Sequence, residues 1–209
     1  MRLSKRATSD TGRSEALLAE LGHGYLAAVQ PDGWPLLRPL NFVYLDGRVY
    51  FHGARKGEKM DTLVTGGRVA FVAARDFSVV PSHFVDSQRA CPATQYYEAV
   101  MIRGRARIVS DPDEKARALQ ALMEKLQPEG GHVPITAREP LYAASLKSTA
   151  VVAIEVEEMT GKLSLGQDRT PTRRKRVIKG LQRRNAPGDA ATIDAMRAAA
   201  PGKELPDPS

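Results

Sequence analysis

Positively charged and hydrogen-bonding residues are concentrated in one stretch, RPLNFVYLDGRVYFHGARKGEKMD, at residues 38–61. Arg55, Lys56 and Lys59 lie around the expected start of a helix, whose N-terminal amides also favour an anion. Proteins bind phosphates with Arg, Lys and backbone N–H groups. Because cations alone would oppose the helix dipole here, an anionic, phosphate-bearing ligand is favoured over the alternative, a solvated helix terminus.

His52 is the residue of this stretch whose chemistry goes beyond binding. Its side chain titrates near neutral pH, which suits a proton donor or a hydrogen-bonding group beside a substrate. It ends a predicted strand and precedes Gly53, which permits close approach of a ligand to the backbone. The alternatives are a structural or solvated histidine and, for Gly53, a simple turn at the strand end.

Short strands separated by turns must position these residues. Alternating residues bounded by turn formers predict six strands, at residues 24–30, 36–44, 48–52, 68–74, 95–109 and 149–157. Apolar residues at helical spacing predict helices at residues 14–21, 56–64, 111–126 and 190–199. Asp46-Gly47 is a strong signal for a two-residue hairpin. Residues 76–94 show no period and are expected to form a long loop.

The order of these elements predicts an antiparallel β-barrel decorated by helices, because tight turns join the early strands. No G-x-G-x-x-G motif follows a strand, which disfavours a Rossmann sheet, and no P-loop motif occurs. Gly104 lies inside the long strand at residues 95–109 and is a candidate position for a bulge.

The composition is that of an ordinary globular protein, with 42% hydrophobic and 26% charged residues in 209. No apolar run approaches the roughly 20 residues of a membrane span, and the charged N-terminal segment lacks the apolar core of a secretory signal. Cys91 is the single cysteine, which excludes an internal disulfide, and the four histidines lack the spacing of metal ligands. We therefore expect a cytoplasmic protein with no membrane contact and no metal site.

The net charge of +7 comes from one segment rather than from the whole chain. RTPTRRKRVIKGLQRR, at residues 169–184, holds eight Lys and Arg residues and no acidic residue. Without these eight, 23 of the 31 basic residues remain against 24 acidic ones. Val177, Ile178 and Leu181 share one helical face. A docked helix with a solvated basic surface is therefore favoured over a contact with nucleic acid or an acidic partner, which stays open.

Several motifs in this order resemble the FMN-binding split-barrel superfamily, which has the fold of pyridoxamine 5′-phosphate oxidase. They are RPLNFVY, RVYFHGARKGEKMDTL, RVAFVAA, YYEAVMIRGRARIV and AVVAIEVEEMTGK, and the similarity covers residues 17–162. Within the superfamily the chain most resembles the nitroimidazole-resistance (Nim) group, and GKLSLGQDRTPTRRKRVIKGLQRR is similar to the end of PaiB-type FMN-binding proteins. The resemblance implies a mainly β fold with helices. It consists of a six-stranded antiparallel split β-barrel at residues 1–165 and a basic helical extension at residues 166–209.

The same resemblance implies FMN as the cofactor and indicates the residues that bind it. They are Arg38, Pro39, Leu40, Asn41, Phe51, His52, Gly53, Ala54, Arg55, Lys56, Lys59, Tyr97, Arg103 and Gln167. Lys59 is the first candidate for the phosphate, with Arg38 second, and His52 is the implied catalytic residue beside the flavin or substrate. For Tyr97, packing within the sheet is the alternative.

Two functions are consistent with the resemblance. The first is a flavin-dependent oxidoreductase, a reductase acting on a small molecule such as a nitro compound. The second is a non-catalytic, FMN-binding regulatory protein whose basic C-terminal helix contacts nucleic acid or a protein partner. Relatives imply a homodimer with flavin sites at the interface, and FAD, a deazaflavin coenzyme or haem stay open as cofactors. GKLSLGQD replaces the Arg- and Trp-rich ending of true pyridoxamine-phosphate oxidases, so that reaction is not expected.

Overall fold

The computed structural model describes residues 6–8, 10–64 and 67–200, and its contacts divide the chain into two units. Unit 1 contains the described residues of Met1–Ser9, Ala74–Ala99 and Gly161–Ser209, and unit 2 contains those of Asp10–Ala73 and Val100–Thr160. The domain boundary expected at residue 165 stays a prediction. By contacts, the segment Ala74–Ala99 groups with the C-terminal helices.

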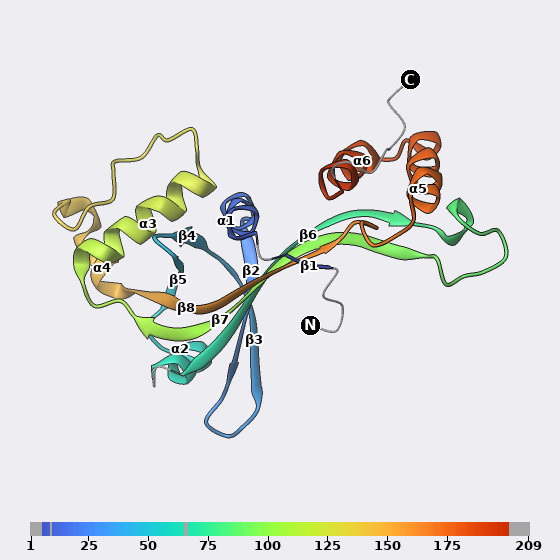
Figure 1. Ribbon diagram of the computed structural model, residues 1–209. Helices are drawn as coiled ribbons and strands as arrows, with labels where there is room; N and C mark the ends of the chain where they lie inside the picture. Colours follow the sequence, from blue (N-terminus) through green and yellow to red (C-terminus); the bar gives the residue numbers. More distant parts are fainter. Residues whose placement is uncertain (1–5, 9, 65–66, 201–209) are drawn as a thin grey trace. The chain divides into compact units, whose positions relative to one another are not determined.

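Eight strands form one sheet in the order β3-β2-β6-β7-β8-β5-β4, with β1 paired to β8 (Figure 1). They are β1 (Ala7–Thr8), β2 (His23–Val29), β3 (Pro35–Asn41), β4 (Val43–Leu45), β5 (Arg48–Ala54), β6 (Arg68–Val80), β7 (Thr94–Ile108) and β8 (Thr149–Ser164). The helices are α1 (Thr11–Glu20), α2 (Glu58–Leu63), α3 (Pro112–Leu126), α4 (Ala143–Ser148), α5 (Pro171–Arg184) and α6 (Asp189–Ala198). The mainly β, antiparallel fold with added helices is confirmed.

The predicted number of six strands is wrong for two reasons. The segment expected as one strand at residues 36–44 is divided at Phe42, because Phe42 and Val43 are both buried and the alternation of a straight strand breaks there. The other additional strand is β1, whose two residues pair with Lys162 and Gly161 of β8.

The segment expected as a long loop at residues 76–94 is mostly ordered secondary structure. β6 continues to Val80, a 3₁₀ turn covers Ser82–Phe84, and β7 begins at Thr94. The extension of β6 is fixed by tertiary contacts that the local sequence does not reveal, since the Ser78 amide donates to Thr192 Oγ1 of α6 at 2.9 Å.

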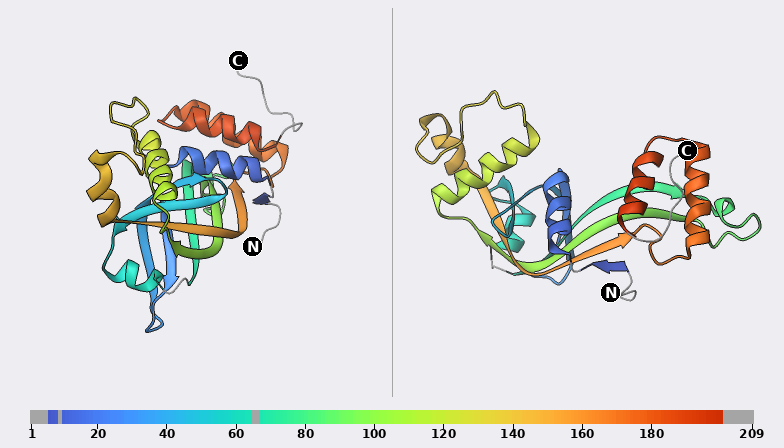
Figure 2. Two further views of the ribbon diagram at one scale, coloured as in Figure 1. Left: turned by 90° about the vertical axis from the view of Figure 1, so that its left-hand side faces the viewer. Right: turned by 45° about the horizontal axis from the view of Figure 1, so that its top comes forward.

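The core of unit 2 lies inside the curled part of the sheet. Apolar side chains of β2, β6, β7 and β8 meet there, and the most deeply buried include Leu26, Phe71, Ile102 and Ile154. Helices α1 and α3 both pack against β4 (Figure 2). The Asp46-Gly47 hairpin is confirmed: both residues have positive φ, 50° and 75°, and the turn sets Leu45 opposite Arg48.

β3 is the terminal strand at one end of the sheet order, and it contains two prolines. Pro35 pairs with Val29 and Pro39 with Tyr25, so both occupy regular positions of the β2–β3 ladder. Proline lacks an N–H and is accepted in a strand where that position faces away from the neighbouring strand. The prolines therefore mark the outer edge of β3.

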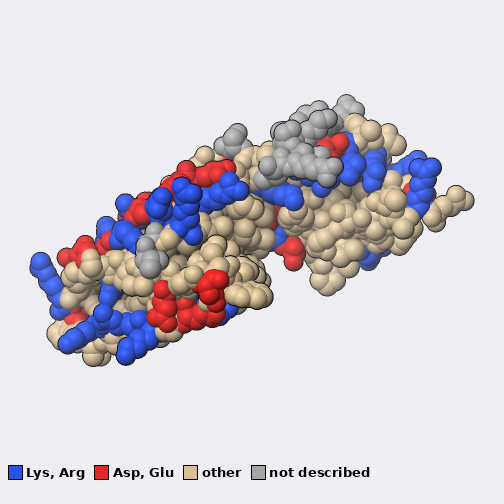
Figure 3. All heavy atoms as spheres, turned by 90° about the horizontal axis from the view of Figure 1, so that it is seen from below, with Lys and Arg blue, Asp and Glu red and all other residues tan. Residues whose placement is uncertain are grey.

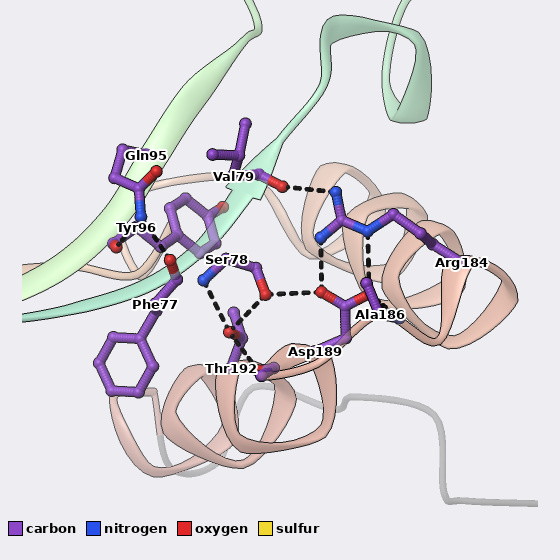
Figure 4. A network of polar contacts seen from close by, with 10 residues as sticks. Phe77, Ser78, Val79, Gln95, Tyr96, Arg184, Ala186, Asp189 and Thr192 are labelled. Atoms are coloured by element: carbon purple, nitrogen blue, oxygen red, sulfur yellow. Dashed lines mark hydrogen bonds and ion pairs between the residues drawn. The ribbon is translucent and has the colours of Figure 1, made fainter.

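In unit 1, α5 and α6 are attached to β6 by a buried polar network (Figure 4). Asp189, 2% exposed, accepts hydrogen bonds from Ser78 Oγ at 2.6 Å and from both Nε and Nη2 of Arg184 at 2.9 and 2.5 Å. Arg184 also donates to the carbonyl of Val79 at 2.9 Å. These donors hold the pKa of Asp189 well below its usual range, and the Arg184 guanidinium is the largest cause.

The apolar face predicted for the basic helix is confirmed. Val177, Ile178 and Leu181 of α5 are buried in one cluster with Ile193 and Met196 of α6. The helix is therefore docked within unit 1, as the favoured interpretation of the sequence has it.

Asp189→Asn is expected to destabilise unit 1 by about 2 kcal/mol, the scale of a lost charged hydrogen bond. Asn keeps the size of the side chain but cannot accept a second hydrogen bond from Arg184 with the same strength. Hydrogen exchange should show faster exchange for amides of α5 and α6. Asp194, an exposed residue of the same helix, supplies the control Asp194→Asn, and equal protection in both variants would contradict the role of the network.

Candidate functional site

The end of β5 positions the residues for which the sequence predicts chemistry. Val49, Tyr50 and Phe51 are all buried, because the barrel core covers one face of β5 and α3 packs against the other. At His52 the strand emerges from this cover, and His52, Ala54 and Arg55 are exposed. The buried part of the strand thus anchors the exposed part.

Lys59 lies over the backbone at this end of β5. Its Nζ is 3.5 Å from the carbonyl oxygen of His52 and 5.2 Å from the ring centroid of Phe51. A Cβ built on Gly53 would lie 2.8 Å from the same Nζ, so glycine is the residue that permits this approach. Among the described residues, no carboxylate lies within ion-pair distance of Lys59.

The predicted helix at residues 56–64 begins later than expected. Gly57 has φ 111° and ψ 165°, which is not helical, and α2 begins at Glu58. Arg55 and Lys56 therefore precede the helix, while Glu58 and Asp61 occupy its first turn as the helix dipole favours. The anion preference of this region rests on the Lys59 ammonium group rather than on the helix terminus.

Arg38 reaches the same region from β3. It forms an ion pair with Glu58, and its Nη1 donates to the carbonyl of Leu37 at 2.9 Å. Burial first, and then the positive charge of Arg38, lower the pKa of Lys59. Lys59 is thus a half-buried ammonium group beside a second cation, an arrangement that a bound anion would stabilise.

The backbone and the side chain of His52 have different surroundings. Its backbone carbonyl faces Lys59, whereas alternation along β5 places its ring on the face of Tyr50. The ring borders a shallow crevice with Ala118 and Leu119 of α3. Although part of the His52 side chain is exposed, desolvation of its covered part is the largest cause that lowers its pKa, and the charge of Lys59 is the second.

The pKa of His52 is expected to rise in the variant Lys59→Met, because removal of a nearby cation favours the imidazolium form. NMR titration of the His52 ring in the variant and in the wild type measures this directly. An unchanged His52 titration in Lys59→Met would contradict the coupling.

The lowered pKa of His52 also sets how the free energy of unfolding depends on pH. Below pH 6.5 the unfolded chain binds more protons at this histidine than the folded chain does, so stability falls as the pH drops through 6.5.

A hollow of about 740 Å³ adjoins the end of β5 in unit 2. Its lining includes Arg55, Lys115 and Lys147 together with apolar residues of α3 and α4. Arg55 donates to the carbonyl of Lys147 at 2.8 Å, and Lys115 donates to the carbonyls of Leu146 and Thr149. Its volume lies within the range of pockets that hold small organic ligands.

The structure brings together Arg38, Phe51, Gly53 and Lys59, with His52 on the same strand. The other predicted residues of unit 2 are arranged differently. Pro39, Asn41, Ala54 and Lys56 are exposed, and Leu40 packs on the barrel core. Arg103 pairs with Glu158 at 3.2 Å. On the larger part at the left of Figure 3, basic side chains similarly lie among acidic ones.

Two predicted residues belong to unit 1 and make contacts there. Tyr97 lies under Lys162, whose Nζ is 5.0 Å from the ring centroid. Gln167 closes its own loop: its Oε1 accepts from the amide of Leu165 at 3.0 Å, and its Nε2 donates to the carbonyl of Leu163 at 2.8 Å. Their assignment to the flavin stays a prediction.

Sequence reasoning missed two residues of the site. Glu58 neutralises Arg38, and Lys147 offers its carbonyl to Arg55. The acidic residue in the first turn of α2 is a signal for Glu58, but the pairing with a residue twenty positions earlier is visible only in the fold. Lys147 lies in α4, a helix that the sequence did not predict.

Two absences concern other kinds of site. Over the described ranges, the helices are too short or too polar to span a bilayer. The same residues contain no group of three or more His, Cys, Asp or Glu side chains suited to a metal ion.

Comparison with known proteins gives one sequence family and a set of similar structures. A family model described as pyridoxamine 5′-phosphate oxidase matches residues 10–163. A flavocytochrome, Anf3 from Azotobacter vinelandii, has a TM-score of 0.64 at 23% identity and covers 76% of this chain and 69% of its own. An FAD- and haem-binding protein from Mycobacterium smegmatis has a TM-score of 0.64 at 20% identity, covering 76% and 73%.

A third structure is that of a candidate 5-nitroimidazole antibiotic resistance protein from Bacteroides thetaiotaomicron. Its TM-score is 0.61 at 21% identity, and the match covers 75% of this chain and 85% of that one. At these identities the similar structures establish the fold. No curated protein matches the chain.

Proposed function

Because the chain belongs to the pyridoxamine 5′-phosphate oxidase family, we propose that it is an FMN-binding flavoprotein that transfers electrons to a small molecule. The observation that carries this proposal is the half-buried ammonium group of Lys59, which has no carboxylate partner among the described residues and lies beside Arg38. An FMN phosphate would supply the missing negative charge. Two of the three similar structures, the flavocytochrome and the FAD- and haem-binding protein, support the same class of cofactor.

The residues at the end of β5 fit FMN in charge and in shape. Lys59 and Arg38 would bind the phosphate, and Gly53 would let a ligand approach the strand backbone. FMN, when bound, supplies the redox chemistry, and the protein positions it and shapes its surroundings. The exposed ring of His52 lies on the opposite face of β5 from Lys59, so it would exchange a proton with a substrate at the end of the strand and would not touch the phosphate. A nitro compound is the substrate class that the Nim resemblance favours.

The absorbance spectrum of the purified protein tests the cofactor. We expect the absorption bands of an oxidised flavin in the near-ultraviolet and the visible. We also expect release of FMN on denaturation and uptake of FMN by the apoprotein. A colourless protein that does not take up FMN would refute the proposal. Uptake of FAD or a deazaflavin in place of FMN would keep the flavoprotein assignment and correct the cofactor.

Steady-state reduction of a nitroaromatic acceptor by NAD(P)H tests the reaction. We expect turnover in the wild type and a large loss of kcat in His52→Ala, with FMN content unchanged. The exposed His83 supplies a matched control, His83→Ala, in which turnover should be retained. Equal rates in wild type and His52→Ala would remove His52 from the catalytic role.

A regulatory function is the second candidate because α5 exposes cations that form no ion pair with an acidic residue in the described part of the chain. Lys175, Lys179 and Arg183 are exposed and spaced by four residues, so they lie along one helical face. The remaining cations are partly used in docking: Arg176 donates to the carbonyl of Val85, and Arg184 pairs with Asp189. Salt-dependent DNA binding without turnover would favour this candidate.

A homodimer is proposed as the working state of the flavoprotein. Large apolar side chains stand exposed on β2 and β3 and on the turn between them: Val29 is 69%, Trp34 71% and Leu37 60% exposed. An exposed apolar surface of this kind marks an interaction site. Light scattering should give twice the chain mass, and Leu37→Glu should give a monomer with reduced FMN affinity.

A further inference from the structure

Unit 1 contains a hollow of about 160 Å³ that three arginines from separate segments border. Arg6 comes from the N-terminal segment, Arg169 from the loop before α5, and Arg173 from the first turn of α5. Hydroxyl groups complete its polar lining, from Thr94, Tyr96 and Ser164. The described lining contains no acidic residue.

A fourth arginine, Arg174, follows Arg173 in α5 and is buried. Arg174 is 0% exposed, and its Nη2 donates to the carbonyl of Met196 at 2.5 Å. Its Nε and Nη1 are buried without a hydrogen-bond partner among the described residues. A buried charge with unpaired donors is costly unless an opposite charge is near.

Arginines of α5 and of the loop before it act on the hydroxyl of Tyr96, which lines the hollow. Burial, the largest cause, raises the pKa of Tyr96 above its usual value, and the charges of Arg174, Arg173 and Arg169 oppose this rise. Tyr96 is 5% exposed, so this hydroxyl is held in place by the surrounding core of unit 1. The wall of the hollow therefore combines the positive charge of these arginines with a hydrogen-bond donor, the Tyr96 hydroxyl.

Only part of this positive charge is neutralised within the described residues. Asp168 accepts hydrogen bonds from Arg6 Nε and Nη2 at 3.2 and 3.1 Å, and its other oxygen is 3.7 Å from Arg169 Nε. One carboxylate thus stands among four guanidinium groups. Arg173 has no acidic partner in the described part of the chain.

We propose that this hollow binds a phosphate dianion, as inorganic phosphate or as the phosphate group of a small monoester. The planar guanidinium group can donate two parallel hydrogen bonds to two oxygens of a phosphate, which suits arginine to phosphate binding. The volume is about five times the ~30 Å³ that a water molecule takes. It is smaller than the roughly 300 Å³ at which pockets for larger organic ligands begin, so a whole nucleotide does not fit. The site uses no residue of the proposed flavin site and goes beyond that function.

Calorimetric titration of inorganic phosphate into the FMN-saturated protein tests the site, in chloride buffer of constant ionic strength. We expect one phosphate per chain, with affinity at least tenfold lower in Arg173→Gln and in Arg169→Gln. Arg183→Gln is the matched control, since Arg183 lies on the same helix and is exposed, and its affinity should equal that of the wild type. Circular dichroism confirms that each variant is folded, and Arg173→Lys, which keeps the charge, should retain part of the affinity.

Methyl phosphate, titrated in parallel, distinguishes the two sources: tighter binding than inorganic phosphate assigns a monoester, and weaker binding assigns the free anion. Phosphate that binds no better than chloride overturns the proposal, as does an equal loss in Arg183→Gln. Lys59→Ala separates this site from the flavin site. Loss of phosphate binding in Lys59→Ala, with retention in Arg173→Gln, would place the anion at Lys59 and overturn the second site.

Discussion

Gly104→Ala is expected to lower the free energy of unfolding by about 3 kcal/mol or more, the upper range for overpacking a core. Gly104 is buried on the interior face of β7, and a Cβ built there would overlap the carbonyl oxygen of Glu155 in β8. That oxygen belongs to backbone and cannot rotate away as a side chain does. The methyl group must push two neighbouring strands apart, at the cost of hydrogen bonds between them.

Chemical denaturation of the variant and the wild type measures this loss. Gly22→Ala is the matched control, because a Cβ on Gly22 would meet no atom within 4 Å and its φ is not in the left-handed region. We expect Gly22→Ala to change stability by less than about 1 kcal/mol. A Gly104→Ala variant as stable as the control would show that β7 and β8 are farther apart than the structure has them.

Lys59→Ala is expected to weaken FMN binding by about 1–3 kcal/mol, the scale of a lost charged hydrogen bond. This corresponds to a dissociation constant about 5- to 150-fold higher. The expectation is at the larger end because Lys59 is half-buried and has no carboxylate partner among the residues described, so its charge is available to a phosphate. Flavin fluorescence titration of the apoprotein gives the constant directly.

Lys56→Ala is the matched control for this prediction. Lys56 lies three residues away and is exposed. We expect its removal to weaken FMN binding by no more than a general loss of positive charge, which added salt should mask. Equal losses in the two variants would mean that the flavin responds to net charge and not to the position of Lys59. Unchanged affinity in Lys59→Ala would move the phosphate elsewhere.

Local patterns predicted the parts of the fold that depend on neighbouring residues. The Asp46-Gly47 turn, the helix Pro112–Leu126 and the buried face of the basic helix all follow from signals within a few residues. The extension of β6 to Val80 does not, because it is stabilised by Thr192, more than a hundred residues away. The hydrophobic pattern around Pro81 cannot indicate such a distant contact.

The candidate site shows the same division. The basic stretch indicated Lys59, but it could not show that Gly57 delays the helix or that Glu58 neutralises Arg38. The first depends on one backbone angle and the second on the meeting of β3 with α2. The positions of Tyr97 and Gln167 relative to a flavin depend on a bound cofactor and a partner chain, which single-chain patterns do not encode.

The two prolines of β3 have a consequence for how copies of this chain can associate. Alternate residues of a strand direct their amides to the same edge, so Pro35, Leu37 and Pro39 share the outer one. Leu37 is the single residue of these three with an N–H to offer. A strand from another molecule could not form a regular ladder with this edge, because β3 offers it too few backbone N–H donors. Leu37 keeps an apolar side chain exposed beside this donor-poor edge, so contact with a second copy at β3 would rely on side chains and not on strand pairing.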